Sequence, residues 1–256
     1  MTLRVPTICI AIYLALSCFT ARADVLIAAA SNIMAPLDEI IVQFEEQTGE
    51  QVKVSYGASG VLSRQIMRGA PFEILLSADR WHIEILSSQG VGILADEDYA
   101  TGRLALFLNG ASPISQDISI LTSFYELGKI RKFAIANPEH APYGRAARDV
   151  LVKLGIWDLA KTTLVMGENA NQAARFAASA STDGGLVPHS LTVLPESVFS
   201  GNTVIVPADM HAPLHQRMAL LDRASSAARL FYDVLRSNNA RSVFLRYGYA
   251  VPEQQG

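Results

Sequence analysis

Short apolar runs alternate with helix-like patterns along this chain, and this alternation restricts its fold more than any other feature. The run at residues 25–29 predicts a buried strand. Apolar residues then recur at helical spacing as far as Phe44, and Gly49 is expected to end that helix. A strand over 52–56 and a helix over 62–67 follow. This order is typical of a parallel sheet covered by helices on both faces.

The same alternation continues to the end of the chain. It predicts strands at 74–77, 104–108, 133–136, 204–206 and 218–221, a turn and short strand at 184–187, and helices at 80–88, 146–154, 171–180, 225–236 and 240–247. With 256 residues, the chain is long enough for one large domain or two lobes. We predict lobe one at residues 24–103 with 215–256, and lobe two at residues 104–214. The expected fold class is α/β, with a mostly parallel sheet flanked by helices in each lobe.

The first 23 residues have the features of a signal peptide. Arg4 precedes an almost wholly apolar stretch over 7–19, and residues 21–23 supply the small-residue pattern of a cleavage site. The apolar stretch is short for a membrane span; a buried first helix and an anchor are the alternatives. Both cysteines, Cys9 and Cys18, lie in this segment, so the rest of the chain suits an oxidising compartment without disulfides. Lipid attachment at Cys18 is a further alternative, although the residues before it are a poor signal for it.

Charge and motifs argue against several classes of function. The net charge of −3 provides no basic field to hold DNA or RNA, and no dinucleotide loop, phosphate loop or zinc motif occurs. The segment Gly57-Ala58-Ser59-Gly60-Val61 misses the serine-hydrolase elbow, because Val61 replaces its last glycine. His211 and His215 could pair on a metal, but Pro213 disfavours a helix between them and no third ligand is evident. We expect both histidines at the surface.

Four aromatic or charged side chains receive a structural interpretation. Asp79 is placed to cap the helix that follows it. His82 is expected on the surface of that helix. Trp81 and Trp157 are expected in the core.

Four strand-to-helix junctions share a composition that suits an anion. They are small or polar, and each opens a helix: residues 28–32, 56–60, 137–144 and 167–171. Such helix starts direct free backbone N–H groups and a positive helix end at one place. Ser31 and Ser59 could add hydroxyl donors. Ordinary capping by serine explains any single junction, but four junctions split between the two halves of the chain favour a shared anion site.

These junctions contain no lysine or arginine before Arg145. Neutral donors are nevertheless sufficient for a dianion. A hydrogen bond to a charged group contributes about 1.5–3 kcal/mol, so roughly six of them reach about 12 kcal/mol, which is the nanomolar scale before binding costs are subtracted.

Several segments, in this order, resemble those of a known family. They are Ala29-Ala30-Ser31-Asn32, the stretches 58–66 and 69–79, the block Asn137-Pro138-Glu139-His140-Ala141-Pro142-Tyr143-Gly144, the stretch 154–157 and the closing stretch 244–249. The Pro-Glu-His-x-Pro block is the most specific of them. Over nearly all of the chain after residue 23, the sequence resembles periplasmic molybdate-binding proteins, the solute receptors of ABC transporters.

The resemblance implies a two-lobed type II periplasmic binding fold, whose interlobe cleft holds an oxyanion through amides and hydroxyls. It implies that Ser31 and Ser59 donate from lobe one, and that the backbone amides of Tyr143 and Ala170 donate from lobe two. Asn32 is a weaker candidate. Many members have a tyrosine where this chain has Pro188, which is therefore a doubtful contact. The hydroxyl of Tyr143 is the candidate to replace that tyrosine.

In function, the resemblance implies a receptor for molybdate, and for tungstate, in the periplasm. It implies no enzymatic activity and no cofactor. Four residues would contact the oxygens of the oxyanion without bonding directly to a metal: Ser31, Ser59, Tyr143 and Ala170. The expected partners are an ABC permease and its ATPase, the expected state is a monomer, and the two lobes would close by a hinge motion.

Three other functions stay open at this stage. The first is a receptor of the same fold for sulfate, phosphate or a small organic acid. Glu139 and Glu168 lie in the junctions and could accept the proton of a phosphate. The second is a secreted hydrolase that uses Ser59. The third is the effector domain of a transcription regulator, against which the signal peptide and the missing DNA-binding helices count.

Overall fold

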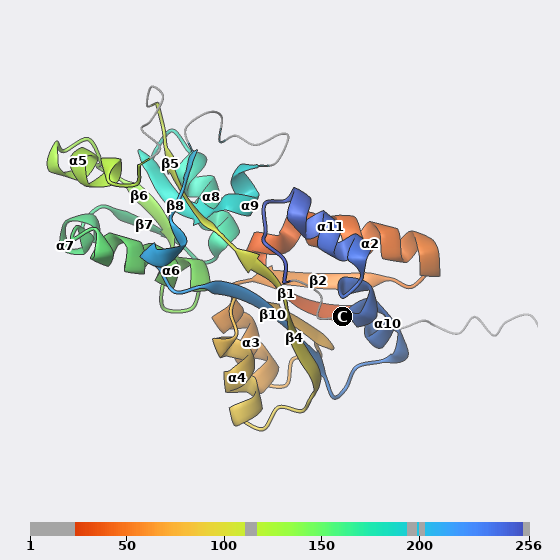
Figure 1. The fold of residues 1–256 in the computed structure, drawn as a ribbon. Helices are drawn as coiled ribbons and strands as arrows, with labels where there is room; N and C mark the ends of the chain where they lie inside the picture. Colours follow the sequence, from red (N-terminus) through yellow and green to blue (C-terminus); the bar gives the residue numbers. More distant parts are fainter. Residues whose placement is uncertain (1–23, 111–116, 194–198, 200–202, 253–256) are drawn as a thin grey trace, which may run out of the picture.

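The computed structural model describes residues 24–110, 117–193, 199 and 203–252. The predicted signal peptide and Cys18 lie outside these residues. Lobe one is built on a sheet with the strand order β2-β1-β3-β10-β4 (Figure 1). Its strands are β1 (Val25–Ala30), β2 (Val52–Gly57), β3 (Ile74–Ser77), β4 (Ile93–Gly102) and β10 (Leu214–Leu221). β1 pairs in parallel with β2 and β3, and β10 runs antiparallel to β3 and β4.

Lobe two repeats this plan with the strand order β7-β6-β8-β5-β9. Its strands are β5 (Leu104–Leu108), β6 (Phe133–Ala136), β7 (Leu164–Gly167), β8 (Gly184–Pro188) and β9 (Thr203–Ile205). β6 pairs in parallel with β7 and β8, and β5 runs antiparallel to β8 and β9. Each sheet is therefore mixed: the expected parallel pairs are present, and two antiparallel pairs accompany them.

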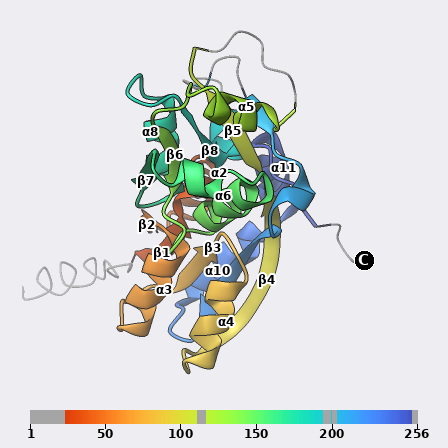
Figure 2. The ribbon, with the colours of Figure 1, turned by 90° about the vertical axis from the view of Figure 1, so that its left-hand side faces the viewer.

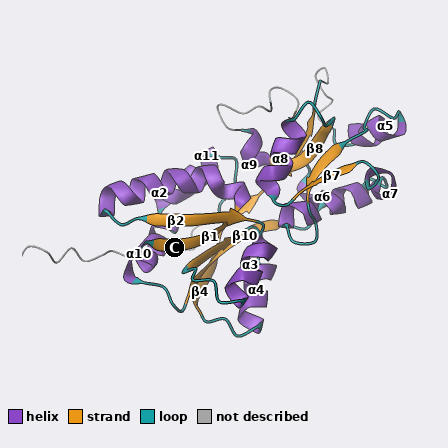
Figure 3. Ribbon diagram, turned by 180° about the vertical axis from the view of Figure 1, so that it is seen from behind, coloured by secondary structure: helices purple, strands orange, loops and turns teal. Residues whose placement is uncertain are grey.

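Helices cover both faces of the sheet in lobe one (Figure 3). They are α2 (Met34–Thr48), α3 (Ser59–Met67), α4 (Trp81–Ser88), α10 (Ser226–Leu235) and α11 (Asn238–Arg246), after the short 3-10 helix η1 (Ser31–Ile33). Side chains of a strand point to alternate faces. Val25 and Ile27 consequently pack with α2, α10 and α11 in one core, whereas Ala28 packs with α3 and α4 in another.

Lobe two follows the same rule. Its helices are α5 (Ile120–Glu126), α6 (Pro142–Lys153), α7 (Trp157–Ala160), α8 (Ala170–Ala178) and α9 (His189–Thr192), with the 3-10 helix η2 (Ala208–Met210). Phe133 and Ile135 pack with α5, α6 and α7, and Ala134 packs with α8 and α9 on the opposite face. The expectation of a two-lobed α/β fold is confirmed. Figure 2 views the lobes from the side, with lobe two above lobe one.

The chain passes between the sheets twice. β4 ends at Gly102 and β5 begins at Leu104, and residues 206–213 lead back from β9 to β10. The predicted division at residues 103/104 and 214/215 follows these two passages and stays a prediction. No helix among the described residues has both the length and the apolar character needed to cross a membrane.

The sequence pattern did not predict β4, because the middle of this edge strand is acidic. Its carboxylates are paired with arginines of neighbouring elements. Asp96 and Asp98 accept hydrogen bonds from Arg217 on β10, at 2.6 and 2.9 Å, and Glu97 lies 2.5 Å from Arg236. Pairing across the sheet offsets the low strand propensity of these residues.

Candidate anion-binding site

All four predicted junctions meet at one small cavity between the lobes. Lobe one contributes the ends of β1, β2 and β3 to this cavity. Lobe two contributes the starts of α6 and α8. The lining residues are Ala30, Ser31, Asn32, Gly57, Ala58, Ser59, Ala78, Ala141, Pro142, Tyr143 and Ala170.

The structure thus brings together five of the six candidate residues: Ser31, Asn32, Ser59, Tyr143 and Ala170. Pro188 is not among the lining residues. It ends β8 and is followed at once by α9. The binding roles of all six residues stay predictions.

Helix starts supply backbone donors around this cavity. η1, α3, α6 and α8 begin at Ser31, Ser59, Pro142 and Ala170. The first N–H groups of a helix have no partner within the helix, and its positive end favours an anion. Pro142 lacks an N–H, so in α6 the first backbone donor belongs to Tyr143. This local geometry agrees with the predicted amide donors at Tyr143 and Ala170.

Two buried serine hydroxyls belong to lobe one. Ser59 Oγ accepts a hydrogen bond from the Ala78 amide at 2.9 Å, which leaves its own O–H able to donate. Ser31 Oγ donates to Asn169 Oδ1 at 3.1 Å and accepts from the Asn171 amide at 3.2 Å. Both partners of Ser31 lie at the start of α8, so this serine joins the two lobes.

A second interlobe contact lies at the start of α3. The Gly60 amide donates to the carbonyl oxygen of His140 at 3.0 Å. A Cβ atom added at Gly60 would lie 2.9 Å from the same oxygen, so a larger residue does not fit there. The lobes are therefore in direct contact beside the cavity, and glycine permits that contact.

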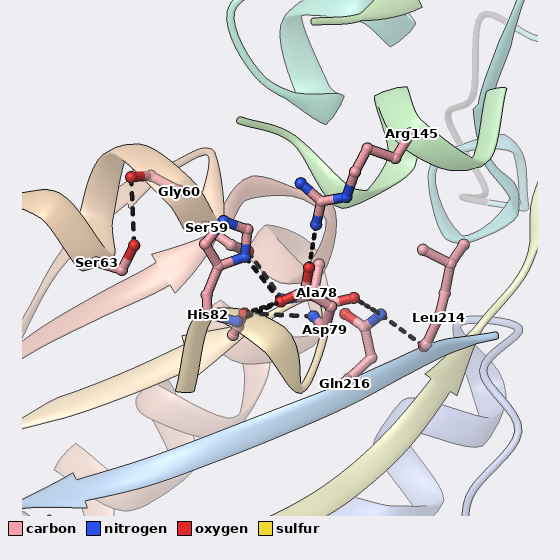
Figure 4. Close-up of polar contacts among 10 residues, drawn as sticks. Ser59, Gly60, Ser63, Ala78, Asp79, His82, Arg145, Leu214 and Gln216 are labelled. Atoms are coloured by element: carbon pink, nitrogen blue, oxygen red, sulfur yellow. Dashed lines mark hydrogen bonds and ion pairs between the residues drawn. The ribbon is translucent and has the colours of Figure 1, made fainter. Parts of the chain in front are cut away.

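The lining of the cavity, within the described part of the chain, includes no lysine, arginine or carboxylate. The cation nearest in sequence, Arg145, is paired with Asp79 (Figure 4). Burial opposes the ionisation of Asp79, but hydrogen bonds from His82 and the charges of His82 and Arg145 outweigh it and lower the pKa of the carboxyl. The pair is thus ionised at neutral pH.

A cluster of buried polar side chains holds Asn32 in place. Its side-chain amide donates to Gln216 Oε1 at 2.8 Å and to the Tyr249 hydroxyl at 2.9 Å. The backbone carbonyl oxygen of Asn32 accepts from the Tyr249 hydroxyl at 2.8 Å and from the Ser190 hydroxyl at 3.2 Å. Sequence analysis missed Gln216, Ser190 and Tyr249. The sequence carries no local signal for them: Gln216 lies between His215 and Arg217 in β10, and its burial follows from the fold.

Tyr143 has its side chain at the passage between the lobes. A Cβ atom added at Gly102 would lie 2.1 Å from the Tyr143 hydroxyl. Burial, together with the neighbouring Tyr249 and Tyr99, raises the pKa of Tyr143 well above its ordinary value. The phenol therefore stays protonated and can donate. Its predicted contact with an anion stays a prediction.

Two expectations for α4 were wrong. His82 is buried rather than at the surface, because its Nδ1 atom lies 2.7 Å from Asp79 Oδ1. Trp81 is 53% exposed rather than in the core, and its ring lies beneath the Arg145 guanidinium. The expected cap is present: Asp79 Oδ1 accepts from the His82 amide at 3.1 Å.

The Asp79–His82 pair lies close to Ser59 but does not form a catalytic triad. The His82 Nδ1 atom is paired with Asp79. His82 Nε2 instead faces Gly60, 2.8 Å from where a Cβ atom would be. Among the described residues, no group of three or more histidine, cysteine or acidic side chains could hold a metal ion.

Comparison with known proteins identifies the family. The profile of the family described as bacterial extracellular solute-binding protein matches residues 25–250. The chain belongs to this family. Its members are transport receptors rather than enzymes, so the hydrolase hypothesis is wrong.

Individual relatives of this solute-binding protein carry more specific names. It is 33% identical over 251 residues to the molybdate-binding protein ModA of Rhodobacter capsulatus, covering 97% of this chain and 96% of that one. It is 34% identical to the ModA protein of Azotobacter vinelandii, covering 92% and 93%. The solved structure of the periplasmic molybdate-binding protein of Azotobacter vinelandii superposes with a TM-score of 0.82 at 28% identity, covering 90% of this chain and all of that one.

Proposed function

We propose that this chain is a periplasmic receptor that encloses molybdate between its lobes and delivers it to an ABC permease. The observation that carries the proposal is the meeting of four helix starts, two from each lobe, around one cavity that no charged side chain of the described residues lines. The names of the relatives support molybdate as the anion.

Uncharged donors favour an anion that carries two full charges and no proton. Hydroxyl and amide hydrogens can replace the water around such an ion without an opposing cation. A partly protonated phosphate also needs an acceptor. Glu139 and Glu168 were candidates for that role, but both are exposed and neither lines the cavity. This arrangement supports molybdate over phosphate.

Tungstate is proposed as a second ligand. A cavity lined by fixed amides selects an anion by its radius and tetrahedral shape. Sulfate has the same shape and charge but is smaller, so fewer of the donors could contact it at once.

The proposed setting follows from the family and the first residues. A receptor of an ABC importer works with a permease and its ATPase. The features of residues 1–23 support export to the periplasm. We propose that the receptor acts there as a monomer.

Calorimetry on the chain from residue 24 onward tests the proposal, with molybdate, tungstate, sulfate and phosphate as ligands. We expect dissociation constants below about 1 μM for molybdate and tungstate, and weaker binding of sulfate and phosphate. Affinity for a true dianion should be constant near neutral pH. Binding of molybdate only at millimolar concentrations would overturn the proposal, and tighter binding of sulfate would support a receptor for another oxyanion.

A further inference from the structure

One ion pair joins the lobes beside the candidate site. Arg145 lies in the first turn of α6, in lobe two, and its Nη2 atom donates to Asp79 Oδ2 (Figure 4). Asp79 is the second residue after β3, in lobe one. The two side chains are only 26% and 13% exposed, so water screens their attraction less than it would at an open surface.

Asp79 is held in place by its own lobe. Its Oδ1 atom accepts from the His82 amide at 3.1 Å and lies 2.7 Å from His82 Nδ1. The Ser77 hydroxyl also donates to it, at 3.1 Å. The carboxylate therefore keeps its position whether or not Arg145 is present.

Arg145 has a different environment, because both of its recorded partners lie across the interface. Apart from Asp79, its guanidinium lies over the Trp81 ring, 5.0 Å from the ring centroid. Trp81 begins α4 in lobe one. When the lobes separate, Arg145 loses both partners and returns to water.

In each lobe, the ion-pair residue lies close in sequence to a predicted donor or to its hydrogen-bond partner. Ala78, the residue before Asp79, donates its amide to Ser59 Oγ. Tyr143, two residues before Arg145, supplies the first backbone donor of α6. The pair therefore fixes the start of α6 against the segment that orients Ser59.

On the basis of the proposed function, we infer that Arg145 and Asp79 are positioning residues for anion binding: their ion pair forms as the lobes close and holds the donors of both lobes around the anion. Neither side chain lines the cavity. The pair acts on affinity by raising the fraction of molecules in the closed, binding-competent state.

A double-mutant cycle tests this inference, with affinity measured by calorimetry. We expect Arg145→Gln to raise the dissociation constant for molybdate about tenfold, and that for tungstate by the same factor, because the pair does not touch the anion. In an Asp79→Asn background the same change should cost less than twofold. Arg145→Lys, which keeps the charge but not the planar group, should lie between the native chain and Arg145→Gln.

The matched control is Arg80→Gln. Arg80 borders the same face of the interface but pairs with Asp98 inside lobe one, so its removal changes the net charge equally without breaking an interlobe contact. This variant should bind molybdate within twofold of the native chain. An equal loss for Arg145→Gln in both backgrounds would show that Arg145 does not act through Asp79 and would overturn the inference.

Fluorescence of Trp81 supplies a readout of the contact itself. The chain has two tryptophans, so Trp157→Phe leaves Trp81 as the single emitter. We expect its emission to change when the anion is added, and Arg145→Gln to abolish the change at saturating anion. An unaltered response would contradict the inference. If sulfate binds the native chain more tightly than molybdate, the proposed function fails, and the cycle is run with sulfate instead.

Discussion

Gly60→Ala is the substitution that most sharply separates closure of the lobes from stability of the fold. The added Cβ atom would lie 2.9 Å from the carbonyl oxygen of His140, whereas ordinary contacts are 3.4 Å or more. The lobes would have to separate by about 0.5 Å at this point, which also stretches the bond from the Gly60 amide to His140. Overpacking of this kind costs about 1–3 kcal/mol, equivalent to a 5- to 150-fold rise in the dissociation constant.

This free-energy cost should destabilise the closed state, in which Gly60 contacts His140 of the other lobe. Gly60 is the second residue of α3 and has no positive φ, so alanine suits its backbone and favours the helix. We expect calorimetry to show weaker binding of molybdate. In thermal unfolding without anion, the collision with His140 should not lower the midpoint.

One contact inside lobe one needs a control. The same Cβ atom would lie 2.8 Å from His82 Nε2. In a His82→Ala background this contact is absent, and only the collision with His140 remains. Gly60→Ala should still weaken binding 5- to 150-fold relative to His82→Ala alone, on the conversion of about 1.4 kcal/mol per factor of ten. If the double variant binds molybdate within twofold of His82→Ala, the contact between Gly60 and His140 is not part of the closed state, and the reasoning is refuted.

Three further substitutions extend the test. Ser59→Ala should raise the dissociation constant for molybdate about 10- to 150-fold by calorimetry, since a hydrogen bond to a charged group contributes about 1.5–3 kcal/mol; unchanged affinity would exclude Ser59 from the site. Tyr249→Phe leaves Asn32 without two hydrogen bonds, and the thermal midpoint without anion should fall by about 2–12 °C; a fall of under 1 °C would contradict this role. Because folding lowers the pKa of Asp79 from 3.8, its stabilising effect is present above about pH 4 and is lost as the pH falls through the lowered value. The difference in thermal midpoint between the native chain and Asp79→Asn should therefore shrink on acidification below about pH 4, and a difference that grows would be the opposite of the expected result.

The strand-to-helix order of the fold could be predicted because the central parallel strands β1, β3 and β6 are buried on both faces and are therefore apolar along their length. β1, β3 and β6 match the predicted strands to within one residue. Gly49 ends α2 in the left-handed conformation, as its position after the last apolar residue predicted. β4 could not be predicted, since its acidic side chains are stabilised by arginines that are distant in sequence.

The candidate site likewise combines features that are local in the sequence with contacts that only the fold creates. Helix starts with small residues are local features, so the sequence marks Ser31, Ser59 and Ala170 without any knowledge of the fold. Other partners of Asp79 and Asn32 are distant in sequence. Arg145 is 66 residues from Asp79, and Tyr249 is 217 residues from Asn32. Asp79 and His82 are only three residues apart, but the burial of His82 is evident only in the tertiary structure.

Diffraction from crystals grown with molybdate, recorded at the molybdenum absorption edge, locates the anion without reference to any family. We predict one anomalous peak in the cavity between Ser31, Ser59 and the starts of α6 and α8, with hydroxyl and amide donors within hydrogen-bond distance of its oxygens. No arginine or lysine nitrogen should contact it. A peak beside Arg80 and Arg145, with the cavity empty, would contradict the proposal that neutral donors hold the anion.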